Sequence, residues 1–181
     1  MRREVPKSNA TRLINPGGVI LVSSHYKGKS NIITLAWHTP ISKTPTLIGI
    51  AIAKSHLSYE LIKKSEEFII NIPDLDLLQK VVYCGSMKGE KVDKFKEAPL
   101  TAKKAAQLVN TPYIDECIGH IECSLFDVRD IGDHGLFIGE VIYASAEEEL
   151  FDETWKVDKA KLLFHLGGKY FTSPSQLVEA K

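Results

Sequence analysis

The chain has 181 residues, and its 23 lysines and arginines balance its 23 aspartates and glutamates, so the formal net charge is zero. A chain of this length fits one domain, here residues 1–181, whose core needs no disulfide or metal. The balanced charge provides no strong field for nucleic acid or an anionic membrane, and the longest apolar runs are too short to span a bilayer. We therefore expect a single cytoplasmic domain without a nucleic-acid or membrane partner.

The cysteines and histidines indicate neither a disulfide framework nor a metal site. Cys84, Cys117 and Cys123 are odd in number and form no C-x-x-C motif. The six histidines include no pair at i, i+4 and no H-E-x-x-H motif, so we expect no dedicated metal site. Met1–Leu13 is basic but is followed by Asn-Pro-Gly-Gly and a short strand, which is not the pattern of a signal peptide.

The first predicted strand covers residues 19–24, a short apolar run after Pro16-Gly17-Gly18. In the polar turn that follows, Gly28-Lys29-Ser30 resembles the end of a phosphate-loop motif, but that motif requires a glycine where Ser23 stands. No G-x-G-x-x-G occurs either. Neither a phosphate loop nor a dinucleotide-binding Rossmann unit is therefore indicated.

Two further strands are predicted at Asn31–Trp37 and Thr46–Ala53, separated by a proline-containing loop. The second strand alternates isoleucines on one face with Gly49, Ala51 and Ala53 on the other. A face of such small side chains leaves room for a flat ring, or it packs against another part of the protein. The pattern alone favours internal packing.

A helix is predicted at about residues 56–66, because Ser55 can cap it and apolar residues follow at helical spacing. Free amides at the helix start, with Lys54 and the hydroxyls of Ser55 and Ser58 nearby, predict an anion site. A flat-ring surface one strand away from an anion site suits a mononucleotide cofactor, which we take as a hypothesis.

The remaining elements are predicted from apolar periodicity and turn residues. A strand at 68–72 ends at Pro73, and Asp74 caps a helix that runs out at Cys84-Gly85. The rest are a lysine-rich, solvated excursion at 86–106 with a short helix at 101–108, a long hairpin of strands 118–131 and 136–144, a short helix or strand at 158–164, and a polar tail at 173–181.

About six strands with helical insertions and hairpin-type turns predict a mainly β protein. The strands do not alternate regularly with helices, which argues against a doubly wound parallel sheet. We expect a closed or partly closed antiparallel barrel.

Five segments follow one another in an order that is typical of one family. They are N-I-I-T-L-A-W (31–37), S-Y-E-L-I-K-K-S-E-E-F-I-I-N (58–71), Y-C-G with K-V-D-K-F (83–95), G-D-H-G-L-F-I-G-E-V (132–141) and H-L-G-G-K-Y-F (165–171). Together they resemble the flavin reductase-like family with the FMN-binding split barrel, and especially its flavoredoxin branch. The resemblance implies a six-stranded antiparallel barrel of Greek-key type that binds FMN.

The resemblance also implies which residues lie around the flavin, from the ring edge to the phosphate and the segments that close over it. They are Thr34, Leu35, Ala36, Trp37, Ser42, Ala51, Ile52, Ala53, Lys54, Ser55, His56, Ser58, Tyr59, Cys84, Gly85, Lys94, Phe95, His165 and Tyr170. Relatives commonly carry an arginine within the segment 53–56, where the certain cation of this chain is Lys54. A lysine offers a point charge rather than a bidentate fork.

Simpler structural roles compete with three of these assignments. Trp37 taken alone is more often a core or interface residue, and Lys94 taken alone is more often a surface charge. Cys84, a single cysteine before a glycine at a helix end, is usually structural rather than a reactive thiol.

The function that the resemblance implies is an FMN-binding oxidoreductase of the flavin reductase or flavoredoxin type. Its electron donor would be NADH, NADPH or a reduced protein partner, and the flavin rather than a side chain would carry the chemistry. A ferric reductase using the same site and a non-catalytic electron carrier are the alternatives. We expect a homodimer with the flavin near the subunit interface.

Overall fold

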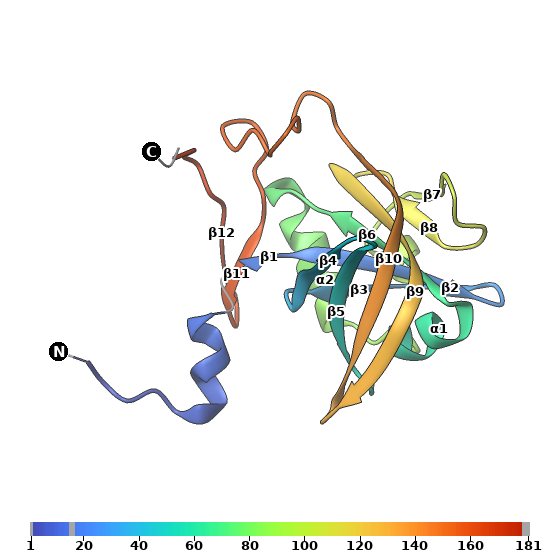
Figure 1. The fold of residues 1–181 in the computed structure, drawn as a ribbon, viewed down its shortest axis with the longest axis horizontal. Coiled ribbons are helices and arrows are strands. Elements are labelled where there is room, and N and C mark those ends of the chain that lie inside the picture. Colours follow the sequence, from blue (N-terminus) through green and yellow to red (C-terminus); the bar gives the residue numbers. More distant parts are fainter. Residues whose placement is uncertain (1, 15–16, 179–181) are drawn as a thin grey trace.

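The computed structural model describes residues 2–14 and 17–178, and most of its strands form one antiparallel sheet (Figure 1). In sheet order the strands are β3 (Lys29–Leu35), β2 (Ile20–Tyr26), β6 (Glu67–Ile72), β9 (Gly119–Ile131), β10 (His134–Ala146), β5 (Thr46–Ala53) and β4 (His38–Lys43). The predicted mainly β class with antiparallel pairing is confirmed. The sheet has seven strands within the described residues, one more than the six expected.

The sheet curls into a partly closed barrel because its two outermost strands are consecutive in the chain. Ala36 and Trp37 alone separate β3 at one edge from β4 at the other. The Trp37 carbonyl accepts a hydrogen bond of 3.0 Å from the Ala51 amide in β5, which extends the β4–β5 pairing by one residue toward β3. The prediction of a loop directly after Trp37 is therefore wrong. Residues 38–43 form a strand, because pairing with β5 satisfies their backbone hydrogen-bonding groups.

The barrel interior is filled by one face of each strand. Ile50 and Ile52 of β5 are fully buried with Phe68 of β6 and Phe137 of β10, so the predicted isoleucine face is confirmed as a core face. Helix α1 (Leu57–Ser65) adds Ile62 and neighbouring apolar residues to the same cluster.

Helix α1 begins without the predicted cap. Ser55 lies in a turn in which the His56 amide donates to the Ala53 carbonyl at 3.0 Å, so the helix starts one residue later than expected. His56 occupies the N-cap position, and no side chain caps the helix. The capping prediction for Ser55 is wrong, because that turn occupies the position at which the serine would act.

The outer face of β2 and β3 is covered by helical segments between β6 and β9. These are η2 (Leu75–Leu77), α2 (Leu78–Ser86) and α3 (Lys94–Glu97). The predicted Asp74 cap is confirmed, since its carboxylate accepts from the Asp76 amide at 3.0 Å. Val81 and Cys84 of α2 are fully buried in a second core cluster with residues of β2 and β3.

The segment 86–106 is less solvated than predicted. Ala98 and Leu100 are buried in the second cluster, because this segment folds back over the sheet. The predicted helix at 101–108 is absent from the described structure. Residues 102–104 instead form β7 (Ala102–Lys104), which pairs with β8 (Pro112–Ile114).

Two carboxylates fasten the loop between β7 and β8 to the sheet. Buried Glu122 accepts hydrogen bonds from the amides of Ala106, Gln107 and Leu108 at 2.6–2.9 Å. Glu67 accepts from the amide and hydroxyl of Thr111, both at 2.8 Å. The amides supply the partners that a buried carboxylate requires.

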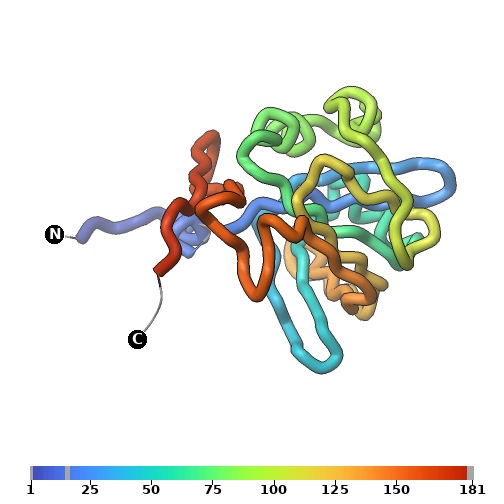
Figure 2. Tube along the Cα trace, turned by 90° about the horizontal axis from the view of Figure 1, so that it is seen from above, coloured from blue at the N-terminus to red at the C-terminus, as the bar shows by residue number. Residues whose placement is uncertain are grey.

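A small three-stranded sheet stands beside the barrel, formed by β1 (Gly17–Gly18), β11 (Phe164–Gly167) and β12 (Tyr170–Thr172) (Figures 1 and 2). The short helix η1 (Lys7–Leu13) lies next to it, away from the body of the barrel. The element predicted at 158–164 is reduced to the first residue of β11 and an isolated bridge at Leu162. The last part of the predicted tail, residues 179–181, lies outside the described residues.

The long hairpin of β9 and β10 is confirmed, with its turn at the predicted glycines. Among the described residues, no helix is both long and apolar enough to cross a membrane.

Candidate functional site

A cavity of about 800 Å³ lies between the barrel, helix α2 and the small sheet. The barrel side contributes Val19, Ile33, Thr34, Leu35, Ala36, Trp37, Ala51, Ala53, His56 and His134. Helix α2 contributes Leu78, Gln79, Val81, Val82, Gly85 and Ser86, and the outer wall consists of Thr11, Arg12, His165, Gly167, Gly168, Lys169 and Phe171.

The small face of β5 forms part of this cavity wall. Ala51 and Ala53 line the cavity while Ile52, between them, is buried in the barrel core. The internal packing predicted for the small face is confirmed for Gly49, where a Cβ would lie 2.7 Å from Ile41 Cδ1, and is wrong for Ala51 and Ala53. A wall of alanines leaves backbone close to a ligand and admits a flat ring.

Trp37 and His134 meet at the edge of the cavity. Their ring centroids lie 5.1 Å apart at 34°, and the Trp37 side chain is 45% exposed, so it is not a core residue. His134 Nδ1 lies 2.7 Å from the Asp133 carboxylate, so Nε2 is the ring nitrogen that is left for another hydrogen-bond partner. His134 was not among the implied site residues, although it lies in the G-D-H-G segment.

Helix α2 approaches β3 closely because of Gly85. The Thr34 hydroxyl donates to the Val81 carbonyl at 2.7 Å. A Cβ atom on Gly85 would lie 3.3 Å from the Thr34 Cβ, closer than ordinary contacts allow. Glycine at this position therefore lets the helix form one wall of the cavity.

Lys94 is buried behind the cavity wall rather than exposed on the surface. Its side chain is 4% exposed, and its ammonium donates to the carbonyls of Ile32 at 2.8 Å and Cys84 at 2.6 Å. Burial lowers the pKa of Lys94 and raises the pKa of the Cys84 thiol to about 11. The thiol is therefore protonated at neutral pH, and the lysine ties α2 to β3.

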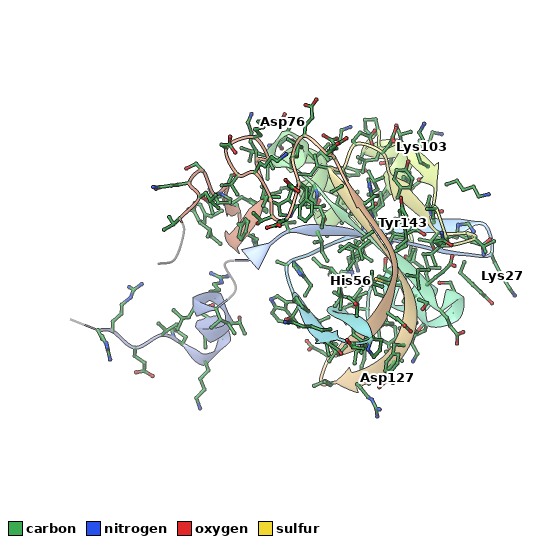
Figure 3. The ribbon with its side chains drawn as sticks, turned by 45° about the horizontal axis from the view of Figure 1, so that its top comes forward. Lys27, His56, Asp76, Lys103, Asp127 and Tyr143 are labelled. Carbon is green, nitrogen blue, oxygen red and sulfur yellow. The ribbon has the colours of Figure 1, made fainter. Side chains whose placement is uncertain are left out.

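His56 lines the cavity at the start of α1, near the centre of the molecule in Figure 3. Partial burial, reinforced by the nearby Lys94 ammonium, lowers the pKa of His56 below 6.5. The ring is therefore neutral at pH 7. The Tyr59 amide donates to the His56 carbonyl at 3.0 Å, and no side chain caps the helix. The amides of Leu57 and Ser58 have no acceptor within the helix, so this corner can donate hydrogen bonds to an anion.

Nine of the implied site residues line the cavity: Thr34, Leu35, Ala36, Trp37, Ala51, Ala53, His56, Gly85 and His165. The others lie outside its lining: Ser42, Ile52, Lys54, Ser55, Ser58, Tyr59, Cys84, Lys94, Phe95 and Tyr170. Several of these side chains instead contact other parts of the protein.

Lys54 and Tyr59 are tied to the β9–β10 turn. The Lys54 ammonium donates to the Gly132 carbonyl at 3.0 Å and lies 3.9 Å from the Asp130 carboxylate. The Tyr59 hydroxyl donates to the same carboxylate at 2.7 Å.

Ser42, Ser58, Phe95 and Tyr170 also have surroundings of their own. Ser58 is fully buried and bonded to the side chains of Ser24 and Asn31, and Phe95 packs on the second core cluster. Ser42 pairs with Leu47 in the β4–β5 ladder, and Tyr170 is 64% exposed.

The cavity fits a flavin mononucleotide on three grounds. Small side chains line the side formed by β5, an uncapped helix start lies at one corner, and no aspartate or glutamate is among the lining residues. The absence of carboxylates from this lining suits a ligand with a phosphate, because like charges would otherwise repel it.

The flavin reductase like domain matches residues 12–173 of the chain. The chain belongs to the flavin reductase-like family. An uncharacterized protein of Pyrococcus abyssi is 34% identical over 162 residues, which are 90% of this chain and 92% of that protein.

Solved structures share the fold of this flavin reductase-like chain. The flavoredoxin of Methanosarcina acetivorans superposes with a TM-score of 0.88 at 26% identity, covering 99% of this chain and 95% of that one. An FMN-binding protein of Thermus thermophilus, solved with p-hydroxybenzaldehyde bound, gives a TM-score of 0.82 at 24% identity, covering 100% and 97%. The predicted family and its split-barrel fold are confirmed.

Proposed function

We propose that this flavin reductase-like protein binds FMN in the cavity and acts as an FMN-dependent oxidoreductase. The observation that carries the proposal is the cavity itself, with its alanine wall on β5, its uncapped helix corner and no carboxylate in its lining. Bound FMN would supply the chemistry, accepting a hydride or electrons and passing them to an acceptor.

The protein's own residues would position the flavin and shield it from water. Ala51 and Ala53 would lie against the ring, and Trp37 with its neighbour His134 would cover the ring edge. The amides at the start of α1 and the neutral His56 would bind the phosphate. Lys54, which is engaged with the β9–β10 turn, has a smaller part in this proposal than the resemblance implied.

Spectroscopy tests the two halves of the proposal separately. The purified protein should be yellow or should quench FMN fluorescence on titration, and anaerobic NADH or NADPH should then bleach the flavin. Colourless protein that does not bind added FMN would refute the cofactor assignment. Flavin that is bound but not reduced by either nicotinamide would leave an electron carrier served by a reduced protein partner, whereas rapid reduction of an added ferric chelate would favour a ferric reductase.

We also propose a homodimer. The helix η1 ends in Leu13 and Ile14, which are 69% and 87% exposed, and the segment after β12 carries the exposed Leu177 and Val178. Apolar side chains on projecting segments are stabilised by burial against another subunit. Since both segments adjoin the outer wall of the cavity, the second subunit would lie near the flavin.

A further inference from the structure

The outer wall of the cavity carries two cations that the proposed flavin site does not use. Arg12 comes from η1 and Lys169 from the turn between β11 and β12, and both line the cavity. These residues lie 157 positions apart in the sequence, and only the folded chain brings them to one wall. Neither is among the site residues that the family resemblance implies, although Lys169 lies within the H-L-G-G-K-Y-F segment.

Arg12 is held against this turn by backbone geometry. A Cβ atom on Gly167 would lie 3.3 Å from Arg12 Cδ and 3.4 Å from its Nε, so the arginine stem lies directly over the glycine. Gly167 has φ +119° and Gly168 has φ +59°, values that favour glycine. His165 donates from Nε2 to the Gly168 carbonyl at 3.0 Å, which closes the turn.

The small sheet fixes the turn to the barrel. Gly17 of β1 pairs with His165 of β11, and the Val19 amide donates to the Leu163 carbonyl at 2.8 Å. Phe171 of β12 packs on the second core cluster. The turn that carries Lys169 is thus anchored through both of its flanking strands.

The charges of Arg12 and Lys169 are not neutralised within the described part of the chain. No carboxylate of residues 2–14 or 17–178 forms an ion pair with either side chain, and the cavity lining contains no acid. Two cations on one wall without acidic neighbours create a positive potential that attracts a polyanion.

This wall lies away from the corner proposed for the flavin phosphate. His56 directly precedes α1, whereas η1 and the β11–β12 turn are on the opposite side of the barrel (Figure 1). A cavity of about 800 Å³ is near the upper end of the roughly 300–1,000 Å³ range of ligand pockets, which leaves room for a second ligand beside a flavin.

We propose that Arg12 and Lys169 form an anion subsite that binds a phosphate group of a nicotinamide donor. The inference rests on the proposed function, because it assumes a flavin at the alanine wall. The shared chemistry is a phosphate group, which a nicotinamide donor offers either as its pyrophosphate or as the 2′-phosphate of NADPH.

Charge-removing variants test the subsite in the FMN-loaded protein. Arg12→Gln combined with Lys169→Gln should raise the KM for the nicotinamide donor at least tenfold and leave kcat and the Kd for FMN within twofold. The control, Arg3→Gln with Lys161→Gln, removes the same charge from exposed positions outside the cavity lining and should change neither constant. Equal loss for NADH and NADPH would assign the subsite to the pyrophosphate, and loss confined to NADPH would assign it to the 2′-phosphate.

A binding measurement keeps the test independent of turnover. ADP and 2′,5′-ADP, titrated calorimetrically into FMN-loaded protein, should bind the wild type and the control but bind the double variant at least tenfold more weakly. Unchanged binding of both probes would overturn the subsite. A parallel fall in FMN affinity would also overturn it, because Arg12 and Lys169 would then bind the flavin phosphate. Failure of the proposed function itself would be seen earlier, as protein that does not take up FMN.

Discussion

At the scale of single residues, burial changes the role expected of charged groups. Lys94 sits in a lysine-rich segment, yet its ammonium is buried and shared between the carbonyls of Ile32 and Cys84. A buried cation is retained only where such acceptors compensate the loss of water. Lys94 therefore joins α2 to β3 through hydrogen bonds, and its charge affects the cavity by lowering the pKa of His56.

Replacing Lys94 with methionine should destabilise the fold by about 1–3 kcal/mol. The substitution leaves two buried carbonyls without donors, and removing the desolvated charge offsets part of that loss. Urea unfolding measures the effect, and Lys96→Met, at an exposed position of the same short helix, is the control. Equal stability of the two variants would show that the Lys94 hydrogen bonds do not stabilise the packing of α2 on β3.

The lowered pKa of His56 predicts how FMN binding depends on pH. In the free protein the ring is neutral at pH 7, and a bound phosphate would raise its pKa, so binding is coupled to proton uptake. Affinity should therefore increase as the pH falls from about 8 to about 7, above the second pKa of a phosphate monoester, which is about 6. Fluorescence titration of FMN measures this, and His56→Asn should flatten the profile. A profile that is equally steep in the variant would exclude His56.

At the scale of secondary structure elements, the two faces of β5 have different tasks. The isoleucine face stabilises the barrel, and the alanine face lines the cavity. A larger side chain on the alanine face would enter the cavity without disturbing the core.

Ala51→Leu should weaken FMN binding at least tenfold while changing the stability by less than about 1 kcal/mol. The backbone bond between the Ala51 amide and the Trp37 carbonyl is preserved, so the pairing beside β5 is kept. Fluorescence titration measures affinity and urea unfolding measures stability. Ile52→Ala, on the opposite face, should show the reverse pattern, with a loss of about 2–5 kcal/mol of stability.

The fully buried carboxylate of Glu122 accepts three of the hydrogen bonds that hold the loop between β7 and β8. Glu122→Gln replaces one of two acceptor oxygens with a donor that faces backbone amides, so stability should fall by about 1–3 kcal/mol. Hydrogen exchange of the Ala106–Leu108 amides should accelerate in the variant. Glu149→Gln, which is exposed, should leave both unchanged.

At the scale of the whole molecule, the projecting segments at the two ends of the chain matter most. Helix η1 contributes Thr11 and Arg12 to the outer wall of the cavity, and the C-terminal segment follows Phe171 of the same wall. Both segments expose apolar side chains that a monomer leaves in water. The net charge of zero provides no long-range repulsion between two copies.

Sedimentation equilibrium should therefore yield a mass of about twice 20.2 kDa. Leu13→Ser with Ile14→Ser should shift the equilibrium toward monomer, whereas Val109→Ser, at an equally exposed position in another loop, should not. A monomeric wild type that binds FMN tightly would refute the dimer.

Local regularities of the chain were predictable because they depend on neighbouring residues. Alternation specified both faces of β5, apolar runs around a glycine turn specified the β9–β10 hairpin, and Asp74 indicated a helix start. The order of five short motifs was sufficient to identify the family and its fold. The side-chain patterns of strands and helices repeat every two to four residues, so they can be recognised in the sequence alone.

The surroundings of individual side chains depended on the tertiary structure. Lys54 was expected near a phosphate but donates to Gly132, a residue that the folded hairpin brings beside it. Arg12 gave no signal in the sequence and meets Gly167 only because β1 pairs with β11. Which carbonyl or carboxylate a cation meets depends on contacts between distant segments, and no local pattern encodes them. The sequence thus determined most strands of the main sheet, the class and the family, while the fold decided which side chains form the cavity.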